Sequence, residues 1–217
     1  MTDLVFDCLG AAADRYAAAP TLVLRLRVAE TTGTPIHAIA LRCQIRLDVQ
    51  RRRYSPEEAE RLMDLFGETS RWGETLKPLQ LLTVSTMVTS FTGSTEVDLE
   101  VPFTYDLDVA TTKYFHALDE GVIPFVLMFN GTIFSKTGEG FSVELVPWHK
   151  ETTYSVPVAT WREVMDVHFP NSGWVRLGRD VLEQLRSFRS QHGITSWDET
   201  VERLLKAEGE AAGRETG

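Results

Sequence analysis

Two apolar runs separated by a short polar break, within residues 121–148, restrict the possible folds of this chain more than any other stretch. Apolar side chains alternate in both runs: Phe125, Leu127 and Phe129, then Phe141, Val143 and Leu145. A period of two is typical of β-strands, whose successive side chains point to opposite faces. The polar break at 136–140 contains two glycines, which tolerate a positive φ. We therefore predict a β-hairpin at the centre of a sheet.

The pair Asn130-Gly131 offers a rival turn, because Asn-Gly is the strongest short sequence signal for a hairpin. A turn at that point would leave residues 132–134 as a stub before a second turn. We therefore place the hairpin turn at 136–140 and expect a glycine bulge at Gly131.

Alternation also marks other strands, at 4–8, 22–28, 39–49, 82–88, 95–105 and 152–156. The run at 39–49 is the longest of these, so it is expected near the middle of a sheet. Ser55, Pro56 and Glu58 predict a helix that begins with a capping box and runs to about residue 66. A short helix is expected at about 108–118. From residue 157 the spacing becomes helical, which predicts three amphipathic helices.

These elements predict an α+β, mainly β fold. We expect an antiparallel β-sandwich-like domain over residues 1–156, with the helix at about 56–66 inserted in it. Residues 157–208 are expected to form a three-helix appendage packed on that domain. Residues 209–217, which are small and polar, are expected to be a flexible tail.

Composition restricts the class of protein. The 217 residues carry a formal net charge of −9, which argues against nonspecific binding to nucleic acid. The sequence has no apolar stretch near the length of about 18 residues that a membrane span needs, and no secretory signal is visible at its start. We therefore expect a cytoplasmic protein. Cys8 and Cys43 are interpreted as small core residues, and a disulfide between them stays open as an alternative.

Few patterns point to chemistry. The five histidines lie at no metal-ligand spacing, and no serine or cysteine stands in the context of an activated nucleophile. The glycines at 138 and 140 are too few for a phosphate-binding loop. Paired acids such as Asp106 and Asp108 lie at turn-like positions, where acids are common for local reasons. We therefore expect no cofactor, no metal and no enzymatic activity.

Basic and aromatic residues are the more promising candidates for binding a partner. If the strands that carry them pair, Arg25, Arg27, Arg42, Arg46 and the triplet Arg51, Arg52 and Arg53 are expected on one outward sheet face. Such a face is explained either by cross-strand pairing with Glu96, Asp98 and Glu100 or by docking of an acidic partner.

Two further segments are candidates for the partner site. Arg71 and Trp72 lie in an irregular loop, where Trp72 is either a lid over the core edge, which we favour, or an exposed anchor. Phe169 and Trp174 bracket a compact bulky turn, and tryptophan is enriched at binding hot spots.

The chain as a whole resembles an actinobacterial family of unknown function. The resemblance rests on an ordered set of segments: AAAPTLVLRLRV, LRCQIRLDVQRRRYS, LFGETSRWG, FTGSTEVDLEVPFTYD, KYFHALDEG, FNGTIF, VPVATWREVMDVHFPNSGWVRL and SWDETVERLL. We associate that family with gene neighbourhoods of the high-affinity nickel–iron hydrogenase. The resemblance thus implies an accessory or assembly role beside that enzyme, and it supplies no catalytic residues. The lack of thiolate or histidine clusters argues that this chain does not itself hold nickel or an iron–sulfur cluster.

Three hypotheses about function remain open. The first is a non-catalytic cytoplasmic factor that binds another protein, such as a hydrogenase component. The second is an enzyme or small-ligand carrier with a cavity lined by His116, Tyr114, Asp106 or His168. The third is a homo-oligomeric structural protein.

Overall fold

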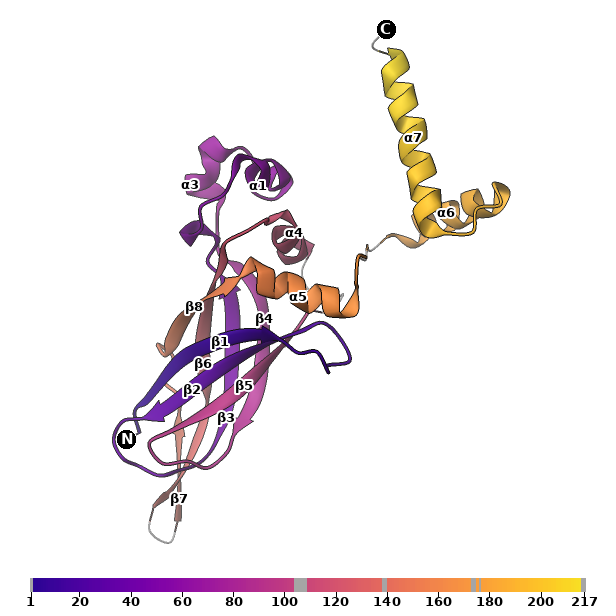
Figure 1. Ribbon diagram of the computed structural model, residues 1–217. Helices are drawn as coiled ribbons and strands as arrows, with labels where there is room; N and C mark the ends of the chain where they lie inside the picture. The colour runs from indigo at the N-terminus through magenta and orange to yellow at the C-terminus, as the bar shows by residue number, and fades with distance from the viewer. Residues whose placement is uncertain (1, 104–108, 138–139, 173–174, 176, 216–217) are drawn as a thin grey trace. The chain divides into compact units, whose positions relative to one another are not determined.

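The computed structural model describes the chain except for residues 1, 104–108, 138–139, 173–174, 176 and 216–217. Two compact units make up the chain, Met1–Ser172 and Gly173–Gly217. The first unit is a sandwich of two antiparallel sheets with short helices gathered at one end (Figure 1). The structure thus confirms the predicted mainly β, sandwich-like fold.

The smaller sheet has three strands in the order β1-β2-β5. Their bounds are β1 (Leu4–Ala13), β2 (Thr21–Glu30) and β5 (Ser94–Pro102). In β2 the alternation of the sequence becomes two faces, because Leu24 and Leu26 are fully buried while Arg25 and Arg27 face solvent. The sheet therefore has one apolar inner face and one charged outer face.

The larger sheet has five strands and is built around β6. Its strands are β3 (Ile36–Leu47), β4 (Leu79–Val88), β6 (Val122–Thr137), β7 (Gly140–Leu145) and β8 (Glu151–Pro157). Strand β3 lies between β4 and β6, as its length predicted. The pairing of Thr137 with Gly140 confirms the hairpin of β6 and β7, whose turn residues 138–139 lie outside the described part.

Gly131 marks the point at which β6 changes partners. Before it, β6 pairs with β8 through residues 122–128; after it, β6 pairs with β7 from Thr132 onward. Gly131 has a φ of +149°, and a Cβ built on it would lie 2.2 Å from the carbonyl oxygen of Ala40 in β3. The β3–β6 register does not shift at Gly131, so the prediction of a bulge there was wrong. Glycine is required instead by a close approach of two backbones.

The core fills the space between the two sheets. Phe6 of β1 stacks on Phe129 of β6 with ring centroids 4.1 Å apart. Leu24, Ile45 and Leu127 around them are fully buried. The alternating apolar residues of the sequence therefore form one packed interior.

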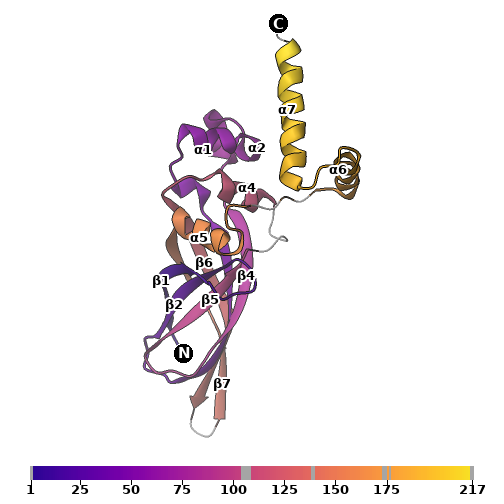
Figure 2. The same cartoon turned by 45° about the vertical axis from the view of Figure 1, so that its right-hand side comes forward.

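Most of the helices in the first unit are short. They are α1 (Pro56–Arg61), α2 (Met63–Phe66), α3 (Trp72–Thr75), α4 (Val109–Ala117) and α5 (Val158–His168), with 3-10 turns at Val49–Arg51 and Thr69–Arg71. Helices α1 and α2 lie where one helix at 56–66 was predicted, and α4 nearly matches the helix predicted at 108–118. Figures 1 and 2 show these helices at the end of the sandwich opposite the β6–β7 hairpin.

The observed units divide at a different place from the expected boundary at residue 156. Helix α5 buries Val158, Trp161 and Val164 and contacts β1, β2 and β8, so it belongs to the first unit. The sequence predicted the apolar stripe of this helix. It did not predict that the stripe packs against the β-sandwich.

The second unit consists of α6 (Arg179–Gln191) and α7 (Trp197–Glu215). The guanidinium of Arg189 lies 4.2 Å from the ring centroid of Trp197. Ile194, in the segment that connects the two helices, is buried. Helix α7 extends to Glu215, where a flexible tail had been expected from residue 209; Ala and Glu, common in this stretch, favour helix. Among the described residues, no helix combines the length and apolarity needed to cross a bilayer.

Candidate partner-binding groove

The first helix at the helix-bearing end of the sandwich, α1, begins with a capped N-terminus. Ser55 accepts a hydrogen bond from the backbone N–H of Glu58, and the Glu58 carboxylate accepts one from the N–H of Ser55, each at 3.1 Å. Pro56 occupies the first helical position, where its missing N–H costs nothing. The predicted capping box is thus confirmed.

Glu58 also holds this helix to a distant loop through Arg52. Arg52 donates to Glu58 Oε1 at 2.5 Å and to the carbonyl oxygens of Glu120 and Val122 at 2.5 and 2.7 Å. The backbone N–H of Asp119 donates to the same Glu58 oxygen at 2.8 Å. The side chains of Arg52 and Glu58 are only 6% and 4% exposed, so this is a buried ion pair.

The pKa of Glu58 is lowered by this arrangement. Burial alone would raise the pKa of the carboxyl group, since it disfavours the charged form. Backbone hydrogen bonds from Asp119 and Ser55, together with the Arg52 guanidinium, outweigh that effect. Glu58 is therefore a structural carboxylate that stays ionised.

Aromatic rings form the floor next to this ion pair. Tyr54 meets Trp72 edge to face at 5.2 Å between ring centroids, and Phe66 meets Trp72 in the same way at 6.4 Å. The Tyr54 hydroxyl donates to Val49 O at 2.7 Å and lies 2.9 Å from the buried hydroxyl of Tyr114. Burial raises the pKa of Tyr54 to about 12, so the phenol stays neutral.

Trp72 covers this floor while keeping part of its ring accessible. Its indole N–H donates to Gly67 O at 2.9 Å, which fixes the ring, and its side chain packs against the core. This supports the interpretation of Trp72 as a lid. Because Trp72 remains half-buried rather than buried, the lid also forms a wall that solvent reaches.

The wall belongs to an open groove of 1010 Å³, here called the Trp72 groove. Its lining is Arg52, Arg53, Tyr54, Ser55, Pro56, Ala59, Glu60, Met63, Glu68, Thr69, Ser70, Trp72 and Leu76. Met63 is 50% exposed, a large fraction for a flexible apolar side chain. Arg53, Glu60 and Glu68 are exposed charges at the rim. An apolar floor with a charged rim is the usual anatomy of a protein–protein contact site.

The structure separates the predicted partner-binding residues. Arg53 and Trp72 line the Trp72 groove, and Arg71 is exposed beside Trp72. Arg51 is exposed but pairs with Asp48 at 2.9 Å. Arg52 is turned inward, as described above.

The turn predicted around Phe169 is the least informative of these candidates. Phe169 is half-buried at the end of α5, where its N–H donates to Met165 O at 2.8 Å. Trp174 lies outside the described residues.

The arginines do not share one face, because the two strands that carry most of them lie in different sheets and do not pair. Arg25 and Arg27 lie on the three-stranded sheet and pair across strands with Asp98 and Glu96, as one of the two explanations held. Arg42 and Arg46 lie on β3 of the other sheet. Sequence alternation gave each residue its face, but the assignment of each strand to a sheet depends on long-range pairing.

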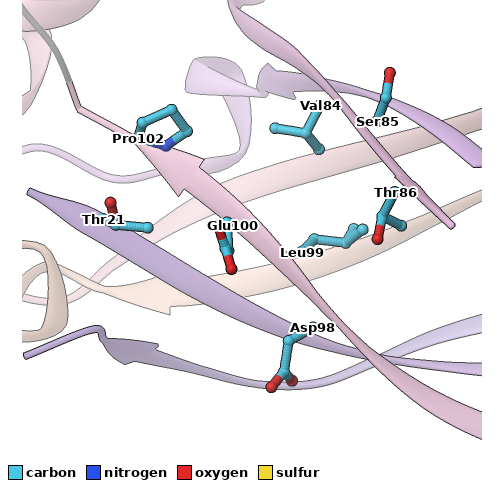
Figure 3. A pocket seen from close by; sticks show the side chains of 8 residues that line it. All are labelled: Thr21, Val84, Ser85, Thr86, Asp98, Leu99, Glu100 and Pro102. Atoms are coloured by element: carbon cyan, nitrogen blue, oxygen red, sulfur yellow. The ribbon is translucent and has the colours of Figure 1, made fainter. Parts of the chain in front are cut away.

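A second hollow lies at the seam between β4 and β5 (Figure 3). It measures 370 Å³ and is lined by Thr21, Val84, Ser85, Thr86, Asp98, Leu99, Glu100 and Pro102. Figure 3 shows Leu99 lying between the two strands while the Asp98 carboxylate points away from β4. The lining of this hollow contains hydroxyl groups and carboxylates. It contains no imidazole, thiol or amine that would complete an acid–base pair.

The residues proposed for a ligand cavity are dispersed. Tyr114 is fully buried among aromatic rings, whereas His116 is exposed with its ring against the edge of Trp161. His168 Nε2 lies 2.9 Å from Ala17 O and connects α5 to the β1–β2 loop. Asp106 lies outside the described residues. Over the described ranges, no three metal-ligating side chains come together.

Both cysteines are expected to react slowly in the folded protein. Burial raises the pKa of the Cys8 thiol to about 11 and that of the Cys43 thiol to about 12, so little reactive thiolate forms. At pH 8, a disulfide reagent such as Ellman's should react at least about 100-fold slower with native protein than with the urea-unfolded chain. Rapid titration of either thiol in the native state would contradict this expectation.

Trp72 and two basic residues of the groove, Arg52 and Arg53, were identified from the sequence, but the other apolar side chains of the groove were missed. Met63 falls within the helix predicted at 56–66, and Tyr54 was given no role in binding. Ala59, Leu62, Met63 and Phe66 form one apolar stripe at helical spacing, so the sequence alone predicts that Met63 is buried with the others. The structure breaks the helix at Leu62, and Met63 is 50% exposed while Leu62 and Phe66 are buried.

Comparison with known proteins gives a family but no activity. No curated protein shows significant similarity to the chain. Among solved structures, β-glucosidase 3B from Thermotoga neapolitana in complex with α-D-glucose matches at 10% identity and a TM-score of 0.25. The match covers 71% of this chain and only 17% of the glucosidase, and a likeness at this TM-score carries no argument. Residues 1–213 match a family model, and the chain therefore belongs to DUF6084, a family of unknown function.

Proposed function

We propose that this protein is a non-catalytic binding or assembly factor that holds another protein in the Trp72 groove. The observation that carries the proposal is that the half-exposed Met63 and the fixed, half-buried indole of Trp72 line the same wide groove. Methionine adapts to irregular apolar surfaces, and a rigid tryptophan supplies a large contact area. A protein segment with an apolar anchor fits this combination.

The charged residues around the Trp72 groove indicate which charges a partner segment would carry. The rim carries Arg53 together with Glu60 and Glu68, and Arg71 lies close by, so a partner segment with charges of both signs can be matched. Among the described residues, the side chains of Arg53 and Arg71 enter no ion pair. Both cations are therefore available to carboxylates on the partner.

The family resemblance adds the finer part of the proposal. It points to a hydrogenase component as the partner, in an actinobacterial cytoplasm. The net charge of −9 supports a protein partner rather than nucleic acid, because phosphates would be repelled.

Site-specific photo-crosslinking in the native host tests the proposal. A photoreactive residue at position 63 should yield a discrete crosslinked protein, which mass spectrometry identifies. Adding Trp72→Ala should reduce that product at least about tenfold, because it removes the rigid wall of the groove. A photoreactive residue at the exposed Thr153, on the outer face of β8, is the control and should not yield the product.

The outcomes separate the general proposal from its specific version. Crosslinking to a hydrogenase component supports both. A discrete partner that is not a hydrogenase component removes the hydrogenase role alone. Absence of any discrete product at position 63, or the same products from positions 63 and 153, overturns the proposal for the groove.

A further inference from the structure

The outer face of the five-stranded sheet carries an apolar patch at the end away from the helices. The β-ladder aligns two rows of outward side chains, Met87–Ala40–Thr132–Leu145 and Ala38–Phe134–Val143. We call these seven residues the sheet patch. Met87, Val143 and Leu145 are 59%, 61% and 76% exposed. The sheet's other face already packs against the three-stranded sheet, so the patch lies outside the core.

The centre of the sheet patch is hollow because its residues are small. A depression of 460 Å³ lies over Ala40 and Gly131, with Met87 and Thr132 in its lining. Neither Ala40 nor Gly131 has a side chain long enough to fill it. Large apolar side chains at Met87 and Leu145 stand at the two ends of the same row, so the row offers a hole between two apolar walls.

Cations border the sheet patch along the strands. Arg42 lies in the outward row on one side, between Ser85 and Asn130, and Lys136 lies on the other side on β6. Both are exposed, and within the described residues neither forms an ion pair.

Carboxylates are missing from these rows. Glu144, the neighbour of Val143 and Leu145, belongs to the opposite face and accepts hydrogen bonds from Thr2 at 3.0 and 3.1 Å. Glu151 lies beyond the Arg42 row, opposite Met128. A second copy of this chain would therefore bring cations against cations, which disfavours self-association through the patch.

The dimensions of the sheet patch suit a helix lying across the strands. Four strands span about 14 Å, which is the length of nearly three turns of helix. The two outward rows are about 7 Å apart, so both fit beneath a helix that is about 10 Å wide. We infer that this surface binds an amphipathic helix of another protein, with apolar residues at helical spacing over the patch and carboxylates along both flanks. This site is at the opposite end of the first unit from the Trp72 groove, and it does not depend on that groove (Figures 1 and 2).

Binding of synthetic helical peptides to the full chain tests the inference. Two peptides of about five turns would share one Leu/Phe face and differ only in having Glu or Lys along the flanks. In amide NMR spectra of the labelled protein, the Glu peptide should shift resonances of residues 38–42 and 130–134. It should bind at least about tenfold more tightly than the Lys peptide, and the difference should shrink as salt rises.

Two variants keep the test independent of folding. Leu145→Asp places a charge at an exposed end of the sheet patch, and it should abolish the shifts while leaving the melting temperature nearly unchanged. Thr153→Asp, on the exposed outer face of β8 away from the patch, should bind like the unmodified chain.

Several results would overturn the inference. These are equal affinities for the Glu and Lys peptides, shifts that map outside the patch, and no binding at millimolar peptide. Dimerisation of the chain at micromolar concentration that Leu145→Asp abolishes would show that a second copy covers the patch instead. None of these outcomes bears on crosslinking at position 63, so the two proposals fail separately.

Discussion

Replacing Gly131 by alanine is expected to lower the free energy of unfolding by at least about 3 kcal/mol. The new Cβ would lie 2.2 Å from the carbonyl oxygen of Ala40, and real Cβ atoms do not approach a backbone so closely. The φ of +149° adds strain, since only glycine adopts it readily. Relief would require β3 and β6 to separate where the sheet is most central. Urea unfolding followed by circular dichroism measures the loss.

Gly10→Ala is the matched control for this substitution. Gly10 also lies in a strand, its φ is not positive, and a Cβ built there meets nothing within 4 Å. Its free energy of unfolding should stay within about 1 kcal/mol of the unmodified chain. If Gly131→Ala were equally mild, the close approach of the two backbones would not exist in solution.

Gly131 also shows where sequence-based reasoning about the fold reached its limit. Alternation on both sides predicted strands, and the longer polar break correctly located the turn. Whether the glycine formed a turn, a bulge or a close approach of two backbones depended on Ala40 of β3, which is 91 residues earlier in the chain. A local pattern contains no information about such a neighbour.

In the candidate site too, local interactions could be predicted from the sequence, whereas long-range ones could not. Ser55 and Glu58 interact within one helical turn that begins at Pro56, so the roles of these three residues followed from the sequence. Arg51, Arg52 and Arg53 are identical in type, and nothing local separates the buried one from the exposed ones. The difference arises because the loop at 119–122 provides carbonyl oxygens and an N–H around the Arg52–Glu58 pair.

The two proposed surfaces have the same physical basis but different chemistry. The Trp72 groove has an aromatic floor and a rim of both signs, while the sheet patch has a small-residue hollow and a cationic border. They lie at opposite ends of one rigidly packed sandwich (Figure 1). A protein that uses both could hold two partners at a fixed separation, which is what an assembly factor requires.

Breaking the Arg52–Glu58 pair is expected to be as costly as the Gly131 substitution. Arg52→Met should lower the free energy of unfolding by about 3–5 kcal/mol, because it leaves the buried Glu58 carboxylate without its cation. Arg51→Ala is the control: the Arg51 side chain is 66% exposed, so its pair with the partly buried Asp48 should contribute less than about 1 kcal/mol. Comparable losses in the two variants would mean that Arg52 is not buried as described.

The same pair predicts a specific dependence of stability on pH. The pKa of Glu58 is lowered in the folded state, so its contribution is fully present above the unfolded pKa of about 4.3 and is lost as pH falls through the folded pKa. Glu58→Gln cannot titrate, so its stability deficit relative to the unmodified chain should be largest at pH 7 and should shrink as the pH falls below 4. Urea unfolding of both proteins at a series of pH values measures this difference. A deficit that stays constant down to pH 3 would contradict a charged Glu58. It would mean that the Glu58 side chain does not change its protonation state, and hence its contribution to stability, over this pH range.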